Sequence, residues 1–361
     1  GTTSARFTKY CARCHTSQGF EEIVGNGKFV VSNDIPNAVR ITCSTCHSHS
    51  SFEFIGDTAA YILRTTSPVP LNYYEVSTAT DFFNNSKTQD FGEINNLCCT
   101  CHQIRGATAT VYSDTTLTPD VINKTFDQLP FFPLDNTKES TTVKYQVGQS
   151  FSVHDGNQSN LYFGINGYEY AGKTYTRTWK HSGQECVSCH MNEYHATTKT
   201  GGHTLIPNEE ECKACHGISD KIAMTQTAID AKRVELGEEL TKKKLFKKTT
   251  NTSGVVSYSA VQSHDFNGKL YPTTQTPGDL FATSVGNNTV SPTTGLVIYG
   301  NMLKYGADPD YKLRIGREWK YGELGAAYNY GYINSELSQG VHNPIYAMQI
   351  LQFSIDYLKS Y

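Results

Sequence analysis

Five copies of one short motif, Cys-x-x-Cys-His, constrain this 361-residue chain more than any other feature. Ten of the 11 cysteines belong to it. The copies are Cys11, Cys14 and His15; Cys43, Cys46 and His47; Cys98, Cys101 and His102; Cys186, Cys189 and His190; and Cys212, Cys215 and His216. Two cysteines separated by two residues and followed by a histidine are the attachment signature of c-type haem. The sequence therefore predicts five covalent haems.

The chemistry of attachment explains why these residue types occur at this spacing. The two thiols add to the two vinyl groups on one edge of the porphyrin, and the two-residue spacer matches their separation. The adjacent histidine then supplies one axial nitrogen to the iron. We expect the ten motif cysteines to bind haem and the five motif histidines to bind iron.

Other uses of paired cysteines fit the pattern less well. Disulfides would not require a histidine after every second cysteine. Zinc sites use two Cys-x-x-Cys pairs for each metal ion, so five pairs would leave one over. A thioredoxin-like redox motif would occur once, near a βαβ pattern. The remaining cysteine, Cys99, is expected to be a buried thiol that binds no iron.

The histidines outside the motifs decide whether each iron keeps an open coordination position. A second histidine closes that position and leaves only electron transfer, whereas an open position binds substrate. Seven of the 12 histidines lie outside the motifs, two more than five irons need. The expected distal ligands are His49, His154, His181, His203 and His342, with His195 and His264 as alternatives. Four methionines make methionine ligation a minor alternative.

The composition agrees with an interior that a cofactor helps to fill. Only 38% of the residues are hydrophobic, which is a thin supply for the core of a chain this long. A net charge of −3 leaves no basic surplus for nucleic acid or an anionic membrane. No apolar run of about 18 residues occurs, so we expect no membrane span. The first residue is not Met, and we expect an exported protein without its signal peptide.

Several stretches resemble exported multihaem c-type cytochromes. This group includes the filament-forming extracellular cytochromes (nanowires) of metal-reducing microbes and relatives of pentahaem nitrite reductases. The stretches are 11–20, 41–49, 96–105, 153–158, 167–173, 179–191, 202–217 and 340–346. The resemblance implies that His154, His181, His203 and His342 are distal ligands. The chain lacks the Cys-x-x-Cys-Lys variant that those reductases use at their catalytic haem.

We expect two regions in the chain. Residues 1–220 hold all five motifs and pack the haems, and residues 221–361 form a C-terminal region. The expected fold class is a multihaem cytochrome, mostly irregular loops with a few α-helices and short β-hairpins wrapped around a haem chain. Short hairpins are predicted around 168–175 and at a turn over 265–270.

Two helices are predicted in the C-terminal region. The spacing of Ile222, Ile229, Leu236 and Leu240 marks one apolar face and predicts a helix over 219–247. Asn343 can cap a terminal helix, and Pro344 suits its first turn. Its expected apolar residues are Ile345, Met348, Phe353 and Ile355. His342 directly precedes this cap, where a rigid helix start can orient its imidazole.

The expected function is extracellular electron transfer through closely spaced bis-histidine haems, without bond-making chemistry and without catalytic residues. The resemblance further implies a homopolymer, with other copies of the chain as partners. Redox proteins or an extracellular acceptor complete the expected partners, and the expected location is extracellular or the cell surface, with the periplasm as the other compartment. A monomeric periplasmic or surface electron shuttle and a pentahaem reductase with one open haem remain alternatives. The reductase would need arginines such as Arg105, Arg177 or Arg314 at its open face.

Overall fold

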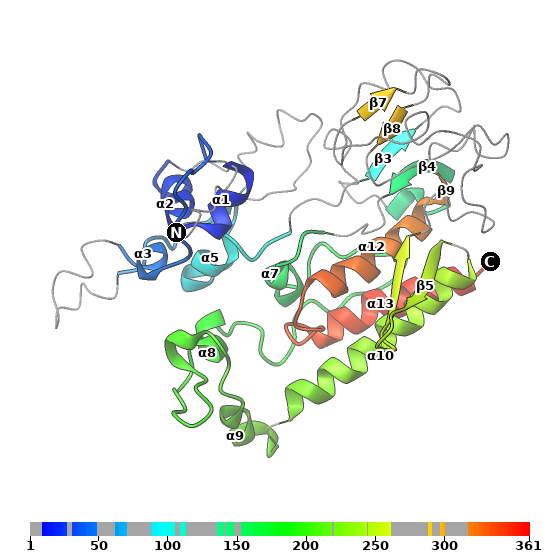
Figure 1. The fold of residues 1–361 in the computed structure, drawn as a ribbon. Coiled ribbons are helices and arrows are strands. Elements are labelled where there is room, and N and C mark those ends of the chain that lie inside the picture. Colours follow the sequence, from blue (N-terminus) through cyan, green and yellow to red (C-terminus); the bar gives the residue numbers. More distant parts are fainter. Residues whose placement is uncertain are drawn as a thin grey trace. The chain divides into compact units, whose positions relative to one another are not determined.

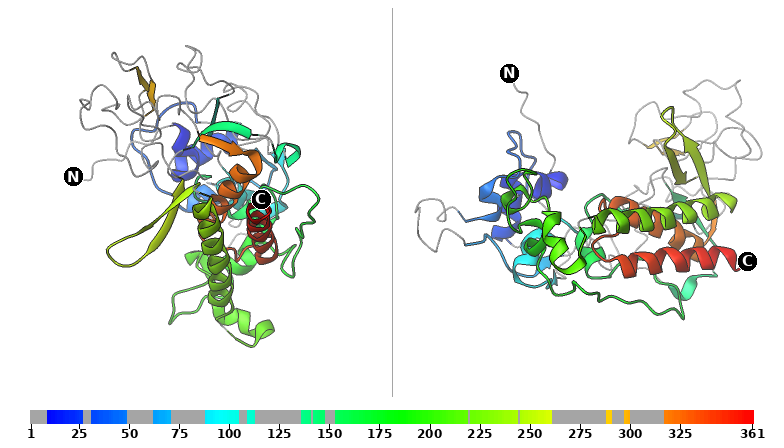
Figure 2. Two further views of the ribbon diagram at one scale, coloured as in Figure 1. Left: turned by 90° about the vertical axis from the view of Figure 1, so that its right-hand side faces the viewer. Right: turned by 90° about the horizontal axis from the view of Figure 1, so that it is seen from below.

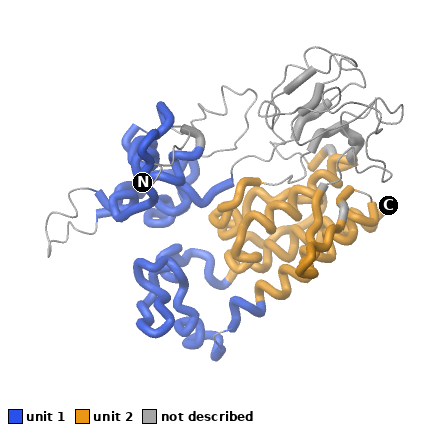
Figure 3. The backbone as a smooth tube through the Cα atoms, viewed as in Figure 1, with its two compact units in different colours: residues 1–104, 180–224 blue, residues 105–179, 225–361 orange. Residues whose placement is uncertain are grey.

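The computed structural model describes thirteen stretches of the chain, which fall into two compact units (Figure 3). The described residues are 9–26, 31–48, 62–70, 88–104, 109–112, 136–140, 142–147, 153–218, 220–243, 245–260, 288–290, 297–299 and 317–361. Unit 1 comprises Gly1–Ile104 and Lys180–Met224. Unit 2 comprises Arg105–Trp179 and Thr225–Tyr361. No helix in the described stretches has both the length and the apolarity to cross a membrane.

Unit 1 consists mainly of short helices and contains all five Cys-x-x-Cys-His motifs (Figure 1). Its first stretch contains α1 (Lys9–His15), α2 (Ser17–Asn26), α3 (Cys43–Cys46), β1 (Val69–Pro70), β2 (Thr88–Gln89) and α5 (Glu93–Cys99). Its second stretch contains α8 (Cys186–His190), η5 (Gly202–Thr204), η6 (Glu209–Cys212) and α9 (Lys213–His216). Strands β1 and β2 pair antiparallel, with Val69 opposite Gln89.

The protein core of unit 1 is confined to its first stretch. One cluster joins Ala12, Ile23 and Val31, and half-buried Val24 and Ile35 pack against it. In the second stretch, none of the described apolar side chains is buried. Instead, its large exposed apolar side chains are Tyr194, Leu205, Ile206, Ile218 and Met224. Protein packing alone therefore leaves this stretch without an interior.

Three helices form the body of unit 2. They are α10 (Lys221–Lys242, of which residues from Thr225 onward belong to this unit), α12 (Tyr321–Ser335) and α13 (Pro344–Lys359). The helices lie side by side in both views of Figure 2. Lys232 on α10 donates to Gln352 on α13 at 2.8 Å. Arg233, also on α10, donates to the hydroxyl of Tyr330 on α12.

Smaller elements complete unit 2. They are β3 (Ala109–Tyr112), η4 (Asn136–Lys138), β4 (Thr142–Val147), α7 (Gln158–Tyr162), β5 (Phe246–Thr250), β6 (Val256–Ala260), β7 (Asn288–Val290), β8 (Val297–Tyr299) and β9 (Arg317–Lys320). Strands β3, β4 and β9 form an antiparallel sheet in that order. The pairs β5–β6 and β7–β8 are hairpins.

Tyrosine hydroxyls hold residues 165–170 against α12 and α13. The hydroxyls of Tyr328 and Tyr332 on α12 donate to the carbonyls of Asn166 and Ile165, each at 2.8 Å. These bonds explain why residues 105–179 belong with the C-terminal part of the chain. The sequence-based division at residue 220 differs here, because it placed that stretch with the haem motifs.

Buried Asn329 adds a second anchor for the same stretch. Its side chain accepts from the Tyr168 amide at 2.7 Å and donates to the Tyr168 carbonyl at 2.9 Å. The hairpin predicted over 168–175 is therefore wrong. A turn does close there, since the Lys173 amide donates to the Tyr170 carbonyl. However, the backbone of Tyr168 bonds with the Asn329 side chain and not with a neighbouring strand. The turn predicted over 265–270 lies outside the described residues.

The structure confirms the helix predicted over 219–247, which spans Lys221–Lys242. Ile229, Leu236 and Leu240 are buried as predicted, and Ile222 is half-buried. Charged side chains cover the other faces of this helix.

The cap predicted for the terminal helix is confirmed too. The side chain of Asn343 accepts from the Tyr346 amide at 3.0 Å, and Pro344 stands in the first turn. The predicted apolar face is only partly right, because Ile355 is buried whereas Ile345 is exposed.

Helix α12 has no counterpart in the sequence-based prediction. Its sequence is rich in tyrosine and glycine, and it is buried nearly all round, so it shows no aliphatic stripe. Gly325 lets the ring of Tyr168 approach the helix backbone, and Gly322 does the same for Tyr357. A Cβ atom at Gly325 would lie 2.3 Å from the Tyr168 ring. In α12, glycines that admit tyrosine rings from other segments take the place of the apolar stripe that usually marks a helix.

Candidate functional site

Each of the five motifs forms a single helical turn. The motifs occupy the end of α1, α3 with the following residue, the end of α5 with the following turn, α8, and η6 with α9. The amide of His47 donates to the Cys43 carbonyl at 2.9 Å, and that of His102 to the Cys98 carbonyl at 3.0 Å. Residues three and four positions apart share one face of a helix. The turn therefore presents both thiols and the histidine of a motif on one side.

The first and third motifs lie side by side in unit 1. Buried Arg13 donates to the carbonyl of Thr100 at 2.8 Å. The Cys14 sulfur lies 4.0 Å from the Cys101 carbonyl oxygen, and the Cys101 sulfur lies 3.9 Å from the Arg13 carbonyl oxygen. Two predicted attachment sites that are far apart in sequence are thus neighbours in space.

The third and fourth motifs are joined as well. The amide of Cys186 donates to the side chain of Asn95 at 2.8 Å. A hydrogen bond with Cys186, together with burial, raises the pKa of Cys98 far above its usual range. For Cys186, the bond with Cys98 acts to lower the pKa, but bonding with Cys99 and burial raise it to about 12. Cys99 is buried, as predicted. The thiols of Cys98 and Cys186 therefore keep their protons at neutral pH.

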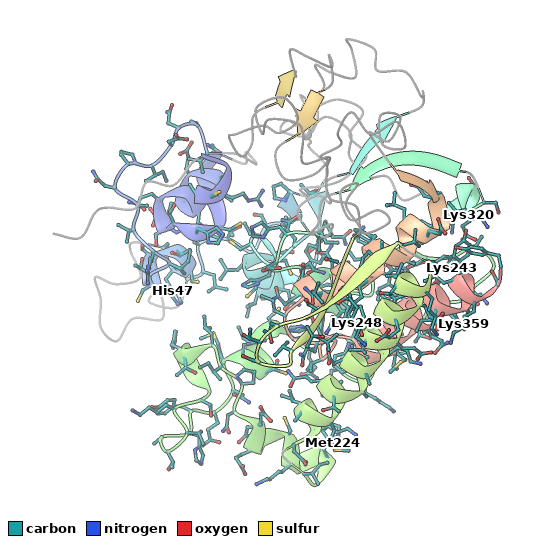
Figure 4. The ribbon with its side chains drawn as sticks, turned by 45° about the vertical axis from the view of Figure 1, so that its right-hand side comes forward. His47, Met224, Lys243, Lys248, Lys320 and Lys359 are labelled. Carbon is teal, nitrogen blue, oxygen red and sulfur yellow. The ribbon has the colours of Figure 1, made fainter. Side chains whose placement is uncertain are left out.

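Two motif histidines each lie close to a histidine that was predicted as a distal ligand. The ring centroids of His47 and His203 lie 6.3 Å apart, and those of His181 and His216 lie 5.9 Å apart. Figure 4 shows His47 at the end of α3. Two imidazoles that bind one first-row metal ion from opposite sides, each at about 2 Å, have ring centres about 6 Å apart. Both separations fit an iron ion between the rings.

The electrostatics of the second pair favour the ligating form of histidine. Burial lowers the pKa of His181, and the nearby charge of His216 lowers it further. Only a neutral imidazole has a lone pair for a metal ion. The lowered pKa therefore favours the neutral form of His181, which can bind a metal ion.

A carbonyl oxygen orients two more of the expected iron ligands. Nδ1 of His190 lies 2.9 Å from the Leu205 carbonyl oxygen, and Nδ1 of His154 lies 2.7 Å from the Asp155 carbonyl oxygen. Since a carbonyl only accepts, Nδ1 carries the proton and Nε2 becomes the metal-binding nitrogen. His15 and His102, the remaining motif histidines, are exposed.

Each of the two distal ligands predicted in unit 2 lies on a segment tied to the same end of α12. The loop of His154 is tied there, because the Gly156 amide donates to the Ser335 carbonyl at 3.0 Å. Nδ1 of His342 contacts the carboxylate of Glu336, which caps the same helix end. Sequence reasoning missed Glu336, since a single acidic residue six positions before a histidine matches no ligand motif.

Of the two alternative ligands, only His195 is described, and its hydrogen bonds do not favour metal binding. Nδ1 of His195 lies 3.3 Å from the Thr198 amide, which can only donate, so the proton of a neutral ring sits on Nε2. That tautomer stabilises the local turn and does not favour metal binding. His49, a predicted ligand, and His264, an alternative, lie outside the described residues.

Of the three arginines named for a reductase, only Arg177 lies in the described residues. Arg177 pairs with Glu169 at 2.8 Å and donates to the Gly164 carbonyl, so it serves the packing of unit 2. Arg105 and Arg314 lie outside the described residues.

The surroundings of the last two motifs fit a large apolar group. Leu205 and Ile206 are more than half exposed beside the fourth motif, and Ile218 is exposed just after the fifth. Exposed aliphatic side chains that lack protein partners gain free energy when an apolar body covers them. The flat face of a porphyrin is such a body.

Among the described side chains, no group of three or more His, Cys, Asp or Glu residues converges on one metal position.

No family model, curated protein or solved structure matches the chain.

Proposed function

We propose that this protein is an electron carrier with five covalent c-type haems, at least two of them ligated by two histidines. The observation that carries the proposal is the pairing of motif histidines with non-motif histidines, His47 with His203 and His216 with His181. Haem iron, when bound, would supply reversible one-electron exchange. A pair of opposed histidines leaves no coordination position for a substrate, which favours electron transfer over a reductase activity.

The residues of the chain would hold and orient this cofactor. The ten motif thiols form the covalent links, and each motif histidine supplies one axial nitrogen. Contacts between the first and third motifs, and between the third and fourth, keep the attachment sites close together. Short separations between haems are what rapid electron exchange requires, because tunnelling decays steeply with distance.

The haem content and spin state of the purified protein test this proposal. We expect five haems per chain, measured by mass and by haem absorbance, and low-spin ferric signals in electron paramagnetic resonance. Fewer than five haems, or a dominant high-spin signal in the unaltered protein, would contradict it.

Single substitutions test the two histidine pairs. In H203A and H181A, we expect one haem per chain to become high-spin while all five stay attached. H195A is the matched control, since His195 accepts the Thr198 amide and faces no motif histidine, and its spectrum should stay low-spin. Unchanged spectra in H203A and H181A would contradict the pairing.

We further propose that the protein acts outside the cell as a polymer of identical subunits. All five motifs belong to unit 1, whereas His154 and His342 belong to unit 2, so a ligand supplied by another copy is compatible with this division. Electron microscopy of the purified protein tests the polymer. Filaments are the expected result, and particles that stay monomeric at high concentration would favour a monomeric shuttle instead.

A further inference from the structure

The carboxylate of Glu336 is fully buried at the junction of α12 and α13. It accepts from the amides of Ser338 at 3.2 Å and Gly340 at 3.0 Å, and from the Ser338 hydroxyl. Its other partner is Nδ1 of His342, which forms an ion-pair contact with Oε1. Burying a charge is expensive unless hydrogen bonds compensate for it. Here several donors converge on one carboxylate, and one of them is an imidazole.

The imidazole of His342 has its Nδ1 edge fixed and part of its ring at the surface. Its side chain is 21% exposed, and the Ser338 hydroxyl lies 2.9 Å from the same Nδ1 atom. Because a carboxylate only accepts, Nδ1 carries a proton and Nε2 becomes the nitrogen for a metal. The next residue, Asn343, caps α13, so the backbone on both sides of the ring is held by helices.

A carboxylate and a carbonyl do not act equally on an imidazole. Nδ1 of His154 and Nδ1 of His190 each lie against a backbone carbonyl, whereas Nδ1 of His342 contacts a carboxylate. A carboxylate behind a metal-bound histidine fixes the ring and raises its basicity as a ligand. A more basic ligand stabilises the higher charge of the oxidised metal.

We propose that Glu336 is a positioning residue, which orients His342 and makes it a more electron-donating ligand. The inference rests on the proposed function, in which His342 binds a haem iron. Through His342, Glu336 lowers the reduction potential of that one haem. Since electrons favour the haems of higher potential, Glu336 thereby influences which haems are reduced first.

Redox titration of the haem-loaded protein, followed by absorbance, tests this role. In E336Q the oxygen that accepts from Gly340 can remain, but the negative charge is lost. We expect five haems and low-spin signals, with one midpoint potential shifted upward and the others unmoved. E336D keeps the charge and should shift the same potential less. E239Q is the control, because buried Glu239 pairs with Lys242 and contacts none of the predicted ligands that the structure describes.

A second variant keeps the inference falsifiable if E336Q does not fold. S338A removes the hydroxyl that donates to Glu336, which leaves the carboxylate a stronger acceptor for His342. The same potential should then move downward. Five unmoved potentials in folded E336Q, or in S338A, would overturn the inference and leave Glu336 a purely structural residue.

The proposed function fails by a different result, namely fewer than five haems or high-spin iron in the unaltered protein.

Discussion

Unit 2 and the second stretch of unit 1 use their apolar side chains in opposite ways. Unit 2 buries Tyr168, Tyr328, Tyr332 and Tyr346 almost completely among three helices. The stretch 180–224 buries no described apolar side chain and carries two of the five motifs. A segment with regular helical turns but no interior of its own needs another body to pack against. The comparison teaches that protein packing defines unit 2, whereas cofactor packing would define this part of unit 1.

Preventing haem attachment should have the largest effect, and it should separate the two regions. When the motif cysteines are replaced by alanine, we expect the amides of 186–216 to lose their hydrogen-exchange protection. The amides of α12 and α13 should keep theirs, since the tyrosine core of unit 2 needs no cofactor. Hydrogen exchange measured by mass spectrometry checks both segments in one sample. Equal loss of protection in the two units would contradict the separation.

High pH should unfold unit 2 through its tyrosines. Burial and the charge of Glu323 raise the pKa of Tyr357 to about 12, and burial and a hydrogen bond to Glu238 raise that of Tyr258 to about 12. The unfolded value is about 10. The folded state holds these protons more tightly, so the stabilisation is complete below about pH 10 and is lost as the pH rises towards about 12.

Tyrosinate absorbance and circular dichroism, recorded together, check this expectation. Helix loss should accompany tyrosine ionisation in that range. Complete ionisation near pH 10 with the helices intact would show that the core of unit 2 does not depend on neutral tyrosines.

Glycine substitutions sharpen the contrast in packing density. A Cβ at Gly325 would meet the Tyr168 ring, so G325V should lower the free energy of unfolding of unit 2 by about 1–3 kcal/mol. Gly25, in α2 of unit 1, has no atom within 4 Å of its Cβ position. G25A should therefore be neutral or stabilising by up to about 1 kcal/mol. Denaturant unfolding measures both, and a destabilising G25A would contradict the loose packing there.

Much of the candidate site follows from the sequence, and the reason is local. A cysteine, a second cysteine three positions on and a histidine directly after it define one helical turn, so the motif geometry needs no distant contact. The sequence also predicts His203 and His181 as distal ligands. It could not predict that His203 lies near His47 and His181 near His216, because that pairing depends on how separate turns assemble.

The fold was harder to predict where packing replaces periodicity. Helix α10 has an aliphatic stripe and was found, and the cap at Asn343 marked the start of α13. Helix α12 gave no signal, because tyrosines buried on every side erase the difference between faces. The contacts between α12 and Tyr168 join residues far apart in the sequence. They also explain why residues 105–179 belong to unit 2.

The last prediction concerns Asn343, which joins two parts of unit 2. Its side chain caps α13 and donates to the Arg177 carbonyl at 2.8 Å. N343A should destabilise unit 2 by about 1–2 kcal/mol, because it removes both the helix cap and the hydrogen bond to the Arg177 carbonyl. Thermal unfolding measures the loss. N343D, which keeps the capping oxygen, should lose less, and equal losses in the two variants would show that the cap contributes nothing.

The contact between Cys98 and Cys186 has a consequence for how the protein matures. These thiols belong to different motifs, yet they hydrogen-bond to one another. In an oxidising compartment, two adjacent thiols form a disulfide, and this one would disable two attachment sites at once. Their raised pKa values slow that reaction, since the thiolate is the attacking species. With haem bound as proposed, the raised pKa values of Cys98 and Cys186 would help to keep both thiols reduced until attachment.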